Sequence, residues 1–171
     1  MRKALKIVAI AALLVTVAGA GALLYAMNTF SPQVVQVGVT ITPAADAREV
    51  FDETMAQLDA GAFSGRVYGS TDGLSAEACA FVTCTVRLSN RGFFPAEWIT
   101  LDVVPLEEDV LELPDAGAYV LASGSTGDIS ATVLTTSQQP GEGRTCRVTC
   151  YVFGREITLE AAQQPQAAGK E

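Results

Sequence analysis

Four cysteines are the residues whose type and spacing most directly suggest chemistry. They stand as two pairs, Cys79 with Cys84 and Cys146 with Cys150. Such a set can form two disulfides, or its four thiolates can hold a zinc ion. The pairs enclose four and three intervening residues, which differs from the C-x₂-C spacing of common zinc sites, so disulfides are the favoured interpretation.

Strand geometry limits which cysteines can pair. In an extended strand Cys146 and Cys150 lie roughly 13 Å apart, whereas bridged Cα atoms lie within about 7 Å. We therefore expect bridges between the two pairs and none within a pair. Cys84 with Cys150 and Cys79 with Cys146 suits parallel strands, and the opposite pairing suits antiparallel strands. Three of the four lie on faces predicted to be buried, which favours bridges across a core over reactive thiols.

The sequence contains no histidine. Ser-His-Asp and Cys-His nucleophilic sites are therefore excluded, and the commonest general base near neutral pH is missing. The carboxylates of Asp72, Glu77 and Glu97 have no spacing that identifies an acid/base pair, and the acidic run 107–109 is interpreted as a solvated turn. Because the sequence also has no phosphate-binding loop and no nucleophile elbow, we expect neither enzyme activity nor a cofactor.

Three aromatic side chains are candidates for contact with a ligand or partner. Trp98 is expected in the core, with a ligand platform as the alternative. Phe93 and Phe94 follow a predicted turn, where adjacent aromatics can touch a partner or the membrane surface, although core packing is favoured. If the rings of Trp98, Tyr119 and Tyr151 were exposed, the domain could instead bind a small ligand such as a carbohydrate.

Charge is unevenly distributed along the chain. Three of the 11 basic residues and none of the 19 acidic residues lie within the first 27 positions, so the remaining 144 residues carry a net charge of −11. That length corresponds to one domain. A domain of that charge repels phosphate backbones, and we expect no nucleic-acid partner.

The N-terminal part of the chain is typical of a membrane anchor. Residues 1–6 contain three basic side chains, and residues 7–27 form a run of 21 residues without a charge. A helix of that length rises by about 30 Å, which matches the hydrocarbon core of a bilayer. Since the first charge after the run is Asp46, the positive-inside rule predicts a single-pass protein of the cell membrane with a cytoplasmic N-terminus and an extracytoplasmic domain.

A cleaved signal peptide, which would make the protein a secreted one, is the alternative interpretation of the same segment. Residues 7–17 would be its apolar core, and residues 18–20 or 20–22 would supply the small side chains of a cleavage site. The apolar run continues past these sites through residues 23–27, which favours an uncleaved anchor with the lipid bilayer as its partner. Both interpretations place the domain on the same side of the membrane.

Short alternating segments beyond the anchor predict β-structure. Residues 33–42 and 80–90 alternate apolar and polar side chains, as half-buried strands do. The side chains expected on the buried face of the first are Val35, Val37, Val39 and Ile41. Further short strands are expected at residues 63–69, 98–104, 110–113, 119–122, 129–135, 145–153 and 156–161. Turn signals about every ten residues make this the pattern of an antiparallel β-sandwich.

One segment changes period and predicts a short amphipathic helix. Within residues 45–59 the apolar positions follow helical spacing. Asp46 is expected to cap its start together with Glu49, and Gly61 to end it. The stripe consists of Val50, Phe51, Thr54, Met55 and Leu58.

Cys84, Trp98 and Cys150 have an order and spacing similar to those of immunoglobulin-like domains. In that family a disulfide joins two parallel strands of facing sheets, and the tryptophan packs on it. The resemblance implies the pairs Cys84–Cys150 and Cys79–Cys146. The chain departs from the family pattern because no tyrosine stands two residues before Cys150.

Residues 83–135 also resemble bacterial extracytoplasmic immunoglobulin-like modules. A strand, an Asn-x-Gly turn and a second strand are followed by a glycine-rich turn into another strand. The resemblance implies a fold and a bacterial envelope location, but no site residues, because such modules serve as spacers, adhesion units and ligand binders alike.

The expected organisation is therefore a tethered single domain. Its parts are a cytoplasmic N-terminus (1–6), a transmembrane helix (7–27), a linker (28–32), an immunoglobulin-like β-sandwich (33–161) and a disordered tail (162–171). We expect a non-catalytic interaction or structural module with an envelope protein as its partner. Phe93, Phe94 and Trp98 are the candidate contact residues, and the alternative is a small-ligand binding domain.

Overall fold

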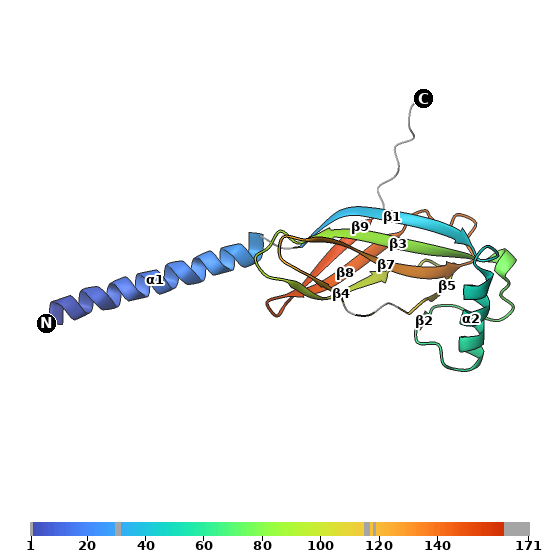
Figure 1. Ribbon diagram of the computed structural model, residues 1–171, viewed down its shortest axis with the longest axis horizontal. Coiled ribbons are helices and arrows are strands. Elements are labelled where there is room, and N and C mark those ends of the chain that lie inside the picture. The colour runs from blue at the N-terminus through green and yellow to red at the C-terminus, as the bar shows by residue number, and fades with distance from the viewer. Residues whose placement is uncertain (1, 30–31, 115–116, 118, 163–171) are drawn as a thin grey trace, which may run out of the picture.

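The computed structural model describes residues 2–29, 32–114, 117 and 119–162, and shows a long helix joined to one end of a β-sandwich (Figure 1). Its elements in chain order are α1 (Arg2–Thr29), β1 (Gln33–Pro43), α2 (Arg48–Asp59), β2 (Arg66–Val67), a 3₁₀ turn (Ala76–Ala78), β3 (Ala80–Ser89), β4 (Ala96–Val103), β5 (Asp109–Glu112), β6 (Tyr119–Leu121), β7 (Thr126–Thr135), β8 (Thr145–Val152) and β9 (Arg155–Ala162). The predicted tail lies outside the described residues apart from Ala162, which ends β9.

The strands form two antiparallel sheets, so the predicted β-sandwich is confirmed. One sheet has the order β1-β3-β7-β5-β2 and the other the order β6-β4-β8-β9. The sequence β1-β3-β7-β5 facing β4-β8-β9 reproduces the strand order of immunoglobulin constant-type domains, with β2 and β6 added at the edges. The strand predicted over residues 63–69 is shorter than expected, because only Arg66 and Val67 pair with β5.

The main hydrophobic core fills the space between the sheets. Strands β3 and β8 supply its centre, with Val82, Cys84 and Val86 from one sheet and Cys146 and Val148 from the other. All five are fully buried. Alternation at a period of two, which the sequence displays in both strands, is what brings these side chains to one face.

Strand β1 corrects one predicted face. A β-bulge between Val34 and Gln36 shifts the register against β3. Val34 therefore packs on the core and Val35 is exposed, although the simple alternation predicts the reverse. Beyond the bulge Val37 and Val39 face the core as predicted, and Ile41 is largely exposed near the strand's end.

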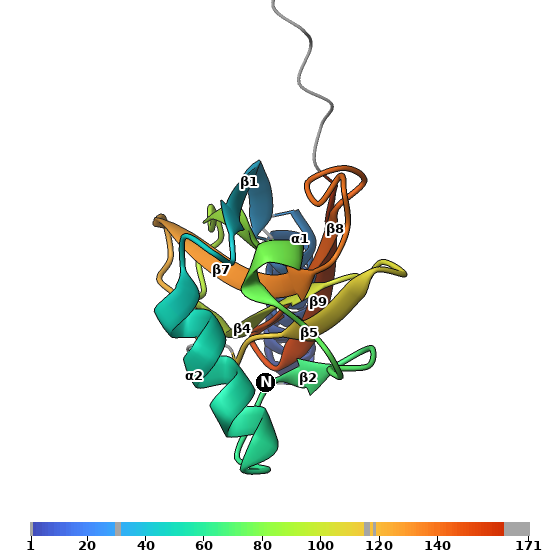
Figure 2. The ribbon, with the colours of Figure 1, turned by 90° about the vertical axis from the view of Figure 1, so that its right-hand side faces the viewer.

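Helix α2 lies at the end of the sandwich away from α1, as Figure 2 shows with α2 at the front. It buries Phe51 and Thr54 and builds a second, smaller core over the outer side of the first sheet. The predicted helix is confirmed, but it begins after Ala47, and no side-chain cap from Asp46 forms. Gly61, with a φ of 63°, follows its end as expected.

Helix α1 is confirmed as a continuous apolar helix. Its segment Lys6–Tyr25 is long and apolar enough to cross a membrane, and none of that segment is buried against the sandwich. Helices of this kind serve as membrane anchors or as signal sequences.

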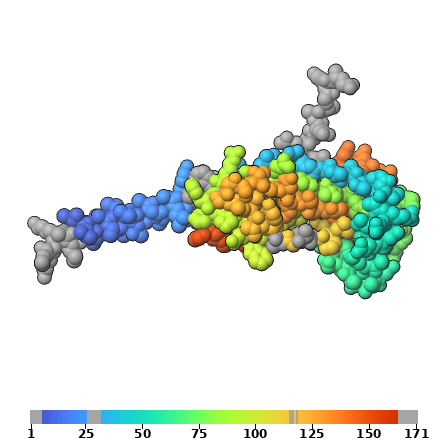
Figure 3. Space-filling model, viewed as in Figure 1, coloured from blue at the N-terminus to red at the C-terminus, as the bar shows by residue number. Residues whose placement is uncertain are grey.

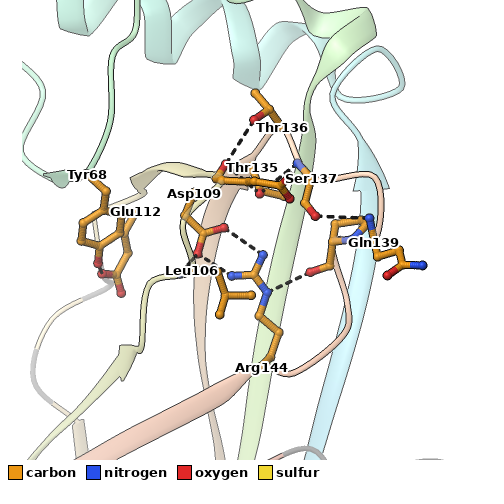
Figure 4. Close-up of polar contacts among 11 residues, drawn as sticks. Tyr68, Leu106, Asp109, Glu112, Thr135, Thr136, Ser137, Gln139 and Arg144 are labelled. Carbon is orange, nitrogen blue, oxygen red and sulfur yellow. Dashed lines mark hydrogen bonds and ion pairs between the residues drawn. The ribbon is translucent and has the colours of Figure 1, made fainter.

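A buried ion pair joins the two sheets at the end away from α1 (Figure 4). Two guanidinium nitrogens of Arg144 bind the two carboxylate oxygens of Asp109 at 2.5 and 2.9 Å, and both side chains are fully buried. Arg144 also donates to the Pro140 carbonyl, and Asp109 accepts from the Leu106 amide. The prediction that residues 107–109 form a solvated turn is therefore wrong for Asp109, because its charge is paired inside the protein.

We expect Arg144→Ala to lower the free energy of unfolding of the full-length protein by about 3–5 kcal/mol, because it leaves the buried Asp109 carboxylate unpaired. Chemical denaturation followed by circular dichroism measures this. The double variant Arg144→Met/Asp109→Leu is the matched control, and we expect it to lie far closer to the wild type. Equal destabilisation in both variants would show that packing, and not charge pairing, decides the stability of this end.

Candidate functional site

Four aromatic side chains gather at the end of the sandwich to which α1 is joined. We call Phe93, Phe94, Trp98 and Phe153 the aromatic rim. Three of them are exposed to an extent unusual for such residues: Phe93 by 69%, Trp98 by 66% and Phe153 by 64%. They come from the β3–β4 loop, the start of β4 and the β8–β9 turn, which meet because Ala96 of β4 pairs with Val152 of β8.

The β3–β4 loop is held in place by Asn90, which is fully buried. Its amide nitrogen donates to the carbonyls of Phe94 at 2.8 Å and Leu121 at 3.1 Å, and its side-chain oxygen accepts from the Gly92 amide at 3.0 Å. The Ser123 hydroxyl adds a bond to the Gly92 carbonyl. A loop whose backbone is bonded on both sides presents Phe93 in a fixed position.

Trp98 is exposed because β4 contains a bulge. Glu97 pairs with Tyr151 and Thr100 with Thr149, so Trp98 and Ile99 together stand opposite the single residue Cys150. Ile99 enters the core, and Trp98, with a φ of 51°, points away from it. A bulge of this kind re-aims a side chain. The prediction of a core tryptophan is therefore wrong, and so is the packing on a disulfide that the immunoglobulin resemblance implied.

Phe153 occupies the first position of a tight turn between β8 and β9. Its φ is 52° and that of Gly154 is 75°, the pattern of a type I′ hairpin turn. A phenylalanine in this conformation is strained. Its ring centroid lies 5.0 Å from that of Phe94, which is half-buried and packs on the core. Phe94 thus supports the exposed ring of Phe153.

The rim lies close to the end of α1. Only residues 30–32 separate Thr29 of α1 from Gln33 of β1, so the two elements are at most about 14 Å apart. Gln33 pairs with Ser89, directly before Asn90. Figure 3 shows the blue helix meeting the end of the sandwich where yellow-green and red segments are exposed. We call this end helix-proximal.

A polar cluster on the side of the sandwich is the strongest alternative site. The Tyr68 hydroxyl bonds to Glu112, and Arg66 lies 2.5 Å from an oxygen of Asp102 and 3.5 Å from one of Glu112. Burial, reinforced by the bond to Glu112, raises the pKa of Tyr68 to about 12. An open hollow of about 320 Å³ borders the cluster. Arg66 pairs with carboxylates from both sheets, so these charges fasten β2 to the body of the fold.

The four cysteines are buried thiols in the structure, so the predicted disulfides are not shown. Cys84 and Cys146 are in hydrogen-bond contact across the core, and this contact, together with burial, raises the pKa of Cys146. Burial also raises the pKa of Cys79 and Cys150. Neutral, buried thiols react slowly with electrophiles.

The structure shows neither of the favoured pairs, Cys84–Cys150 and Cys79–Cys146. Cys79 belongs to the smaller core under α2, whereas the other three belong to the core between the sheets. Five positions separate Cys79 from Cys84, and an odd interval along an extended segment sends two side chains to opposite faces. The same separation keeps the four thiols from meeting at one point, and the described residues contain no group of three or more metal-ligating side chains.

The predicted contact residues Phe93, Phe94 and Trp98 lie in the β3–β4 loop and the first residues of β4, and the ring contact found at this end joins Phe94 to Phe153. Phe153 was not among the predicted candidates. The sequence places Phe153 at the end of the predicted strand 145–153, and Gly154 directly after it is the turn signal that points to its exposure. Tyr119 and Tyr151 are less exposed than Trp98, and the Tyr151 hydroxyl is bonded to Glu156.

No model of a protein family matches the chain, and no curated protein matches it. Solved structures with similar folds include the FixG-related protein from Vibrio parahaemolyticus, at 10% identity over 78% of this chain and 99% of that chain, with a TM-score of 0.34. The yeast GGA1_GAE domain-P21 structure is 15% identical over 60% and 100%, with a TM-score of 0.35. The cupredoxin domain of amoB from Nitrosocaldus yellowstonii is 17% identical over 82% and 95%, with a TM-score of 0.29. At these identities the likeness concerns the fold alone.

We expect any disulfide in the oxidised protein to join Cys84 to Cys146. Both thiols would lose their protons, and the two electrons would pass to a disulfide oxidant, which leaves as a dithiol. Non-reduced tryptic mapping by mass spectrometry measures the pairing, since cleavage after Arg147 places Cys146 and Cys150 on separate peptides. The variant Cys79→Ser should keep the bridge. A linkage through Cys150, or one lost with Cys79, would contradict this expectation.

Proposed function

We propose that the protein is a single-pass membrane protein whose β-sandwich acts outside the cytoplasm as a non-catalytic interaction module. The observation that carries the proposal is the arrangement of an unburied apolar helix, Lys6–Tyr25, only a few residues before the sandwich. The helix has no contact surface within the fold that would bury it, so a bilayer is the environment that suits its side chains.

The charge distribution supports the orientation. Arg2, Lys3 and Lys6 precede the apolar segment, whereas the chain after residue 27 carries a net charge of −11. Basic residues next to a spanning helix remain on the cytoplasmic side, which places the sandwich outside. The same orientation holds if the helix acts as a signal peptide and is removed.

The interaction role is supported by how the polar groups are used. Within the described ranges, the buried charges Asp109, Glu112 and Arg144 all have partners inside the fold. These bonds fasten the sheets to each other. Three side chains of the aromatic rim, in contrast, are exposed to solvent. Exposed apolar patches of this kind are typical of surfaces that bind another molecule or a membrane.

A small-ligand binding domain is the second candidate function, and the exposure of Trp98 favours it. An indole ring open to solvent can stack on a sugar or another flat ligand. Trp98 is the only tryptophan in the chain, so its fluorescence reports on this surface without interference. Titration of the full-length protein with oligosaccharides should change this emission if the second candidate is correct.

We expect the full-length protein to stay in the membrane pellet after alkaline carbonate washing, and its mass to include residues 1–27. The variant Leu13→Lys/Val17→Lys should release it, because each lysine near the middle of a spanning helix costs about 2.5–3.5 kcal/mol. The matched control, Val50→Lys/Val67→Lys, changes two exposed apolar residues of the sandwich and should be retained. A soluble product that lacks the first 20–22 residues would establish the signal-peptide alternative.

A further inference from the structure

The aromatic rim carries an inference that rests on the proposed anchoring and extends it. We propose that the rim seats the helix-proximal end of the sandwich on the headgroup region of the bilayer that α1 crosses. The rim would then hold the domain against the membrane surface, with α2 and the far end pointing away from it. The occupant of this surface is a lipid headgroup layer of the same membrane.

Chain connectivity is the first argument. Thr29 and Gln33 are separated by three residues, so the sandwich end that carries β1 stays within about 14 Å of the helix end. The rim lies at that end, because Gln33 pairs with Ser89 and the β3–β4 loop follows directly. A helix that spans the hydrocarbon core ends in the headgroup region. The short connection between α1 and β1 therefore places the rim close to the membrane surface.

The chemistry of the rim is the second argument. Tryptophan and other aromatic rings concentrate at the membrane–water interface, where an apolar ring meets polar headgroups. Phe93, Trp98 and Phe153 expose about two thirds of their surface each. In a surface directed at water such rings would be unfavourable, whereas in the interfacial layer they are stabilised.

Backbone strain is the third argument. Among the described residues, Trp98 and Phe153 are the only non-glycine residues with a positive φ. Both are aromatic, both belong to the rim, and both point outward. Such conformations are unfavourable and collect at functional surfaces. The bulge in β4 and the turn after β8 thus have the same result, which is to expose an aromatic ring close to the helix-proximal end.

Charge is the fourth argument. The domain as a whole is strongly acidic, yet the three connections at its helix-proximal end, residues 90–95, 122–125 and 153–154, contain Arg91 and no acidic residue. Arg155 follows directly. Glu97 and Glu156 lie on the adjoining strands, and Glu156 accepts a bond from Tyr151. The three connections themselves therefore carry one positive charge and no negative charge, which suits contact with lipid phosphates.

The single tryptophan permits a direct test on the full-length protein. The protein is reconstituted into nanodiscs of phosphatidylcholine and phosphatidylglycerol, and incorporation is measured by co-elution with the discs. Lipids brominated near the headgroup then quench only nearby fluorophores, and acrylamide quenches those in water. We expect loss of Trp98 emission with brominated lipid, a shift of the emission to shorter wavelength, and weak quenching by acrylamide.

Two variants make the test specific. Phe93→Ser should weaken the quenching by brominated lipid and strengthen that by acrylamide, and Arg91→Glu should do the same in discs that contain phosphatidylglycerol. Val67→Ser is the matched control, because Val67 is an exposed apolar residue on β2, away from the rim. It should behave as the wild type.

The outcomes separate the two proposals. Co-elution with the discs combined with strong acrylamide quenching and no effect of brominated lipid overturns the seating alone, and leaves the rim to a protein or carbohydrate partner. Elution free of the discs overturns the anchoring and the seating with it. Equal effects of Phe93→Ser and Val67→Ser would also overturn the seating, since the contact would then not depend on the rim.

Discussion

The apolar layer between the two sheets is the constraint on which the rest of the structure depends. Cys84, Val86 and Leu88 from one sheet and Val148 and Cys150 from the other are buried in this layer, where an unpaired polar group would be costly. The layer must therefore be closed at both ends by polar residues whose bonds are all satisfied. The Arg144–Asp109 pair closes the far end, and Asn90 closes the helix-proximal end.

The two closures have different consequences. Arg144 and Asp109 are fully buried and bind each other, so neither charge is available to a ligand. The role of this pair is structural. Asn90 bonds two backbone groups of the β3–β4 loop and one at the end of β6, and in doing so it fixes the position of Phe93. Asn90 therefore determines the position of an exposed aromatic side chain as well as the closure of the core.

Sequence reasoning predicted the elements and the sandwich, because alternation over eight to ten residues is a strong local signal in β3, β7 and β8. It misplaced individual side chains wherever a bulge changes the register. Val35 and Trp98 are exposed because each lies in such a bulge. A bulge depends on pairing with a distant strand, so the local sequence does not reveal it. The face of Cys79, in contrast, was readable from its odd distance to Cys84, and Asp109 became buried only because Arg144 lies opposite it in the fold.

The size of the rim is consistent with a tethered contact. Three exposed rings offer too little surface for stable association between free partners, which commonly bury about 800 Å² on each side. In the proposed arrangement α1 holds the sandwich within about 14 Å of the headgroups, so the encounter is intramolecular, and the effective concentration of the surface compensates for the weakness of each contact. Because α1 supplies the proximity in this arrangement, the rim needs only to set the orientation of the sandwich relative to the membrane surface. A strained tryptophan and a strained phenylalanine, fixed on a bulge and a tight turn, suit that task better than mobile side chains, since little freedom is lost on contact.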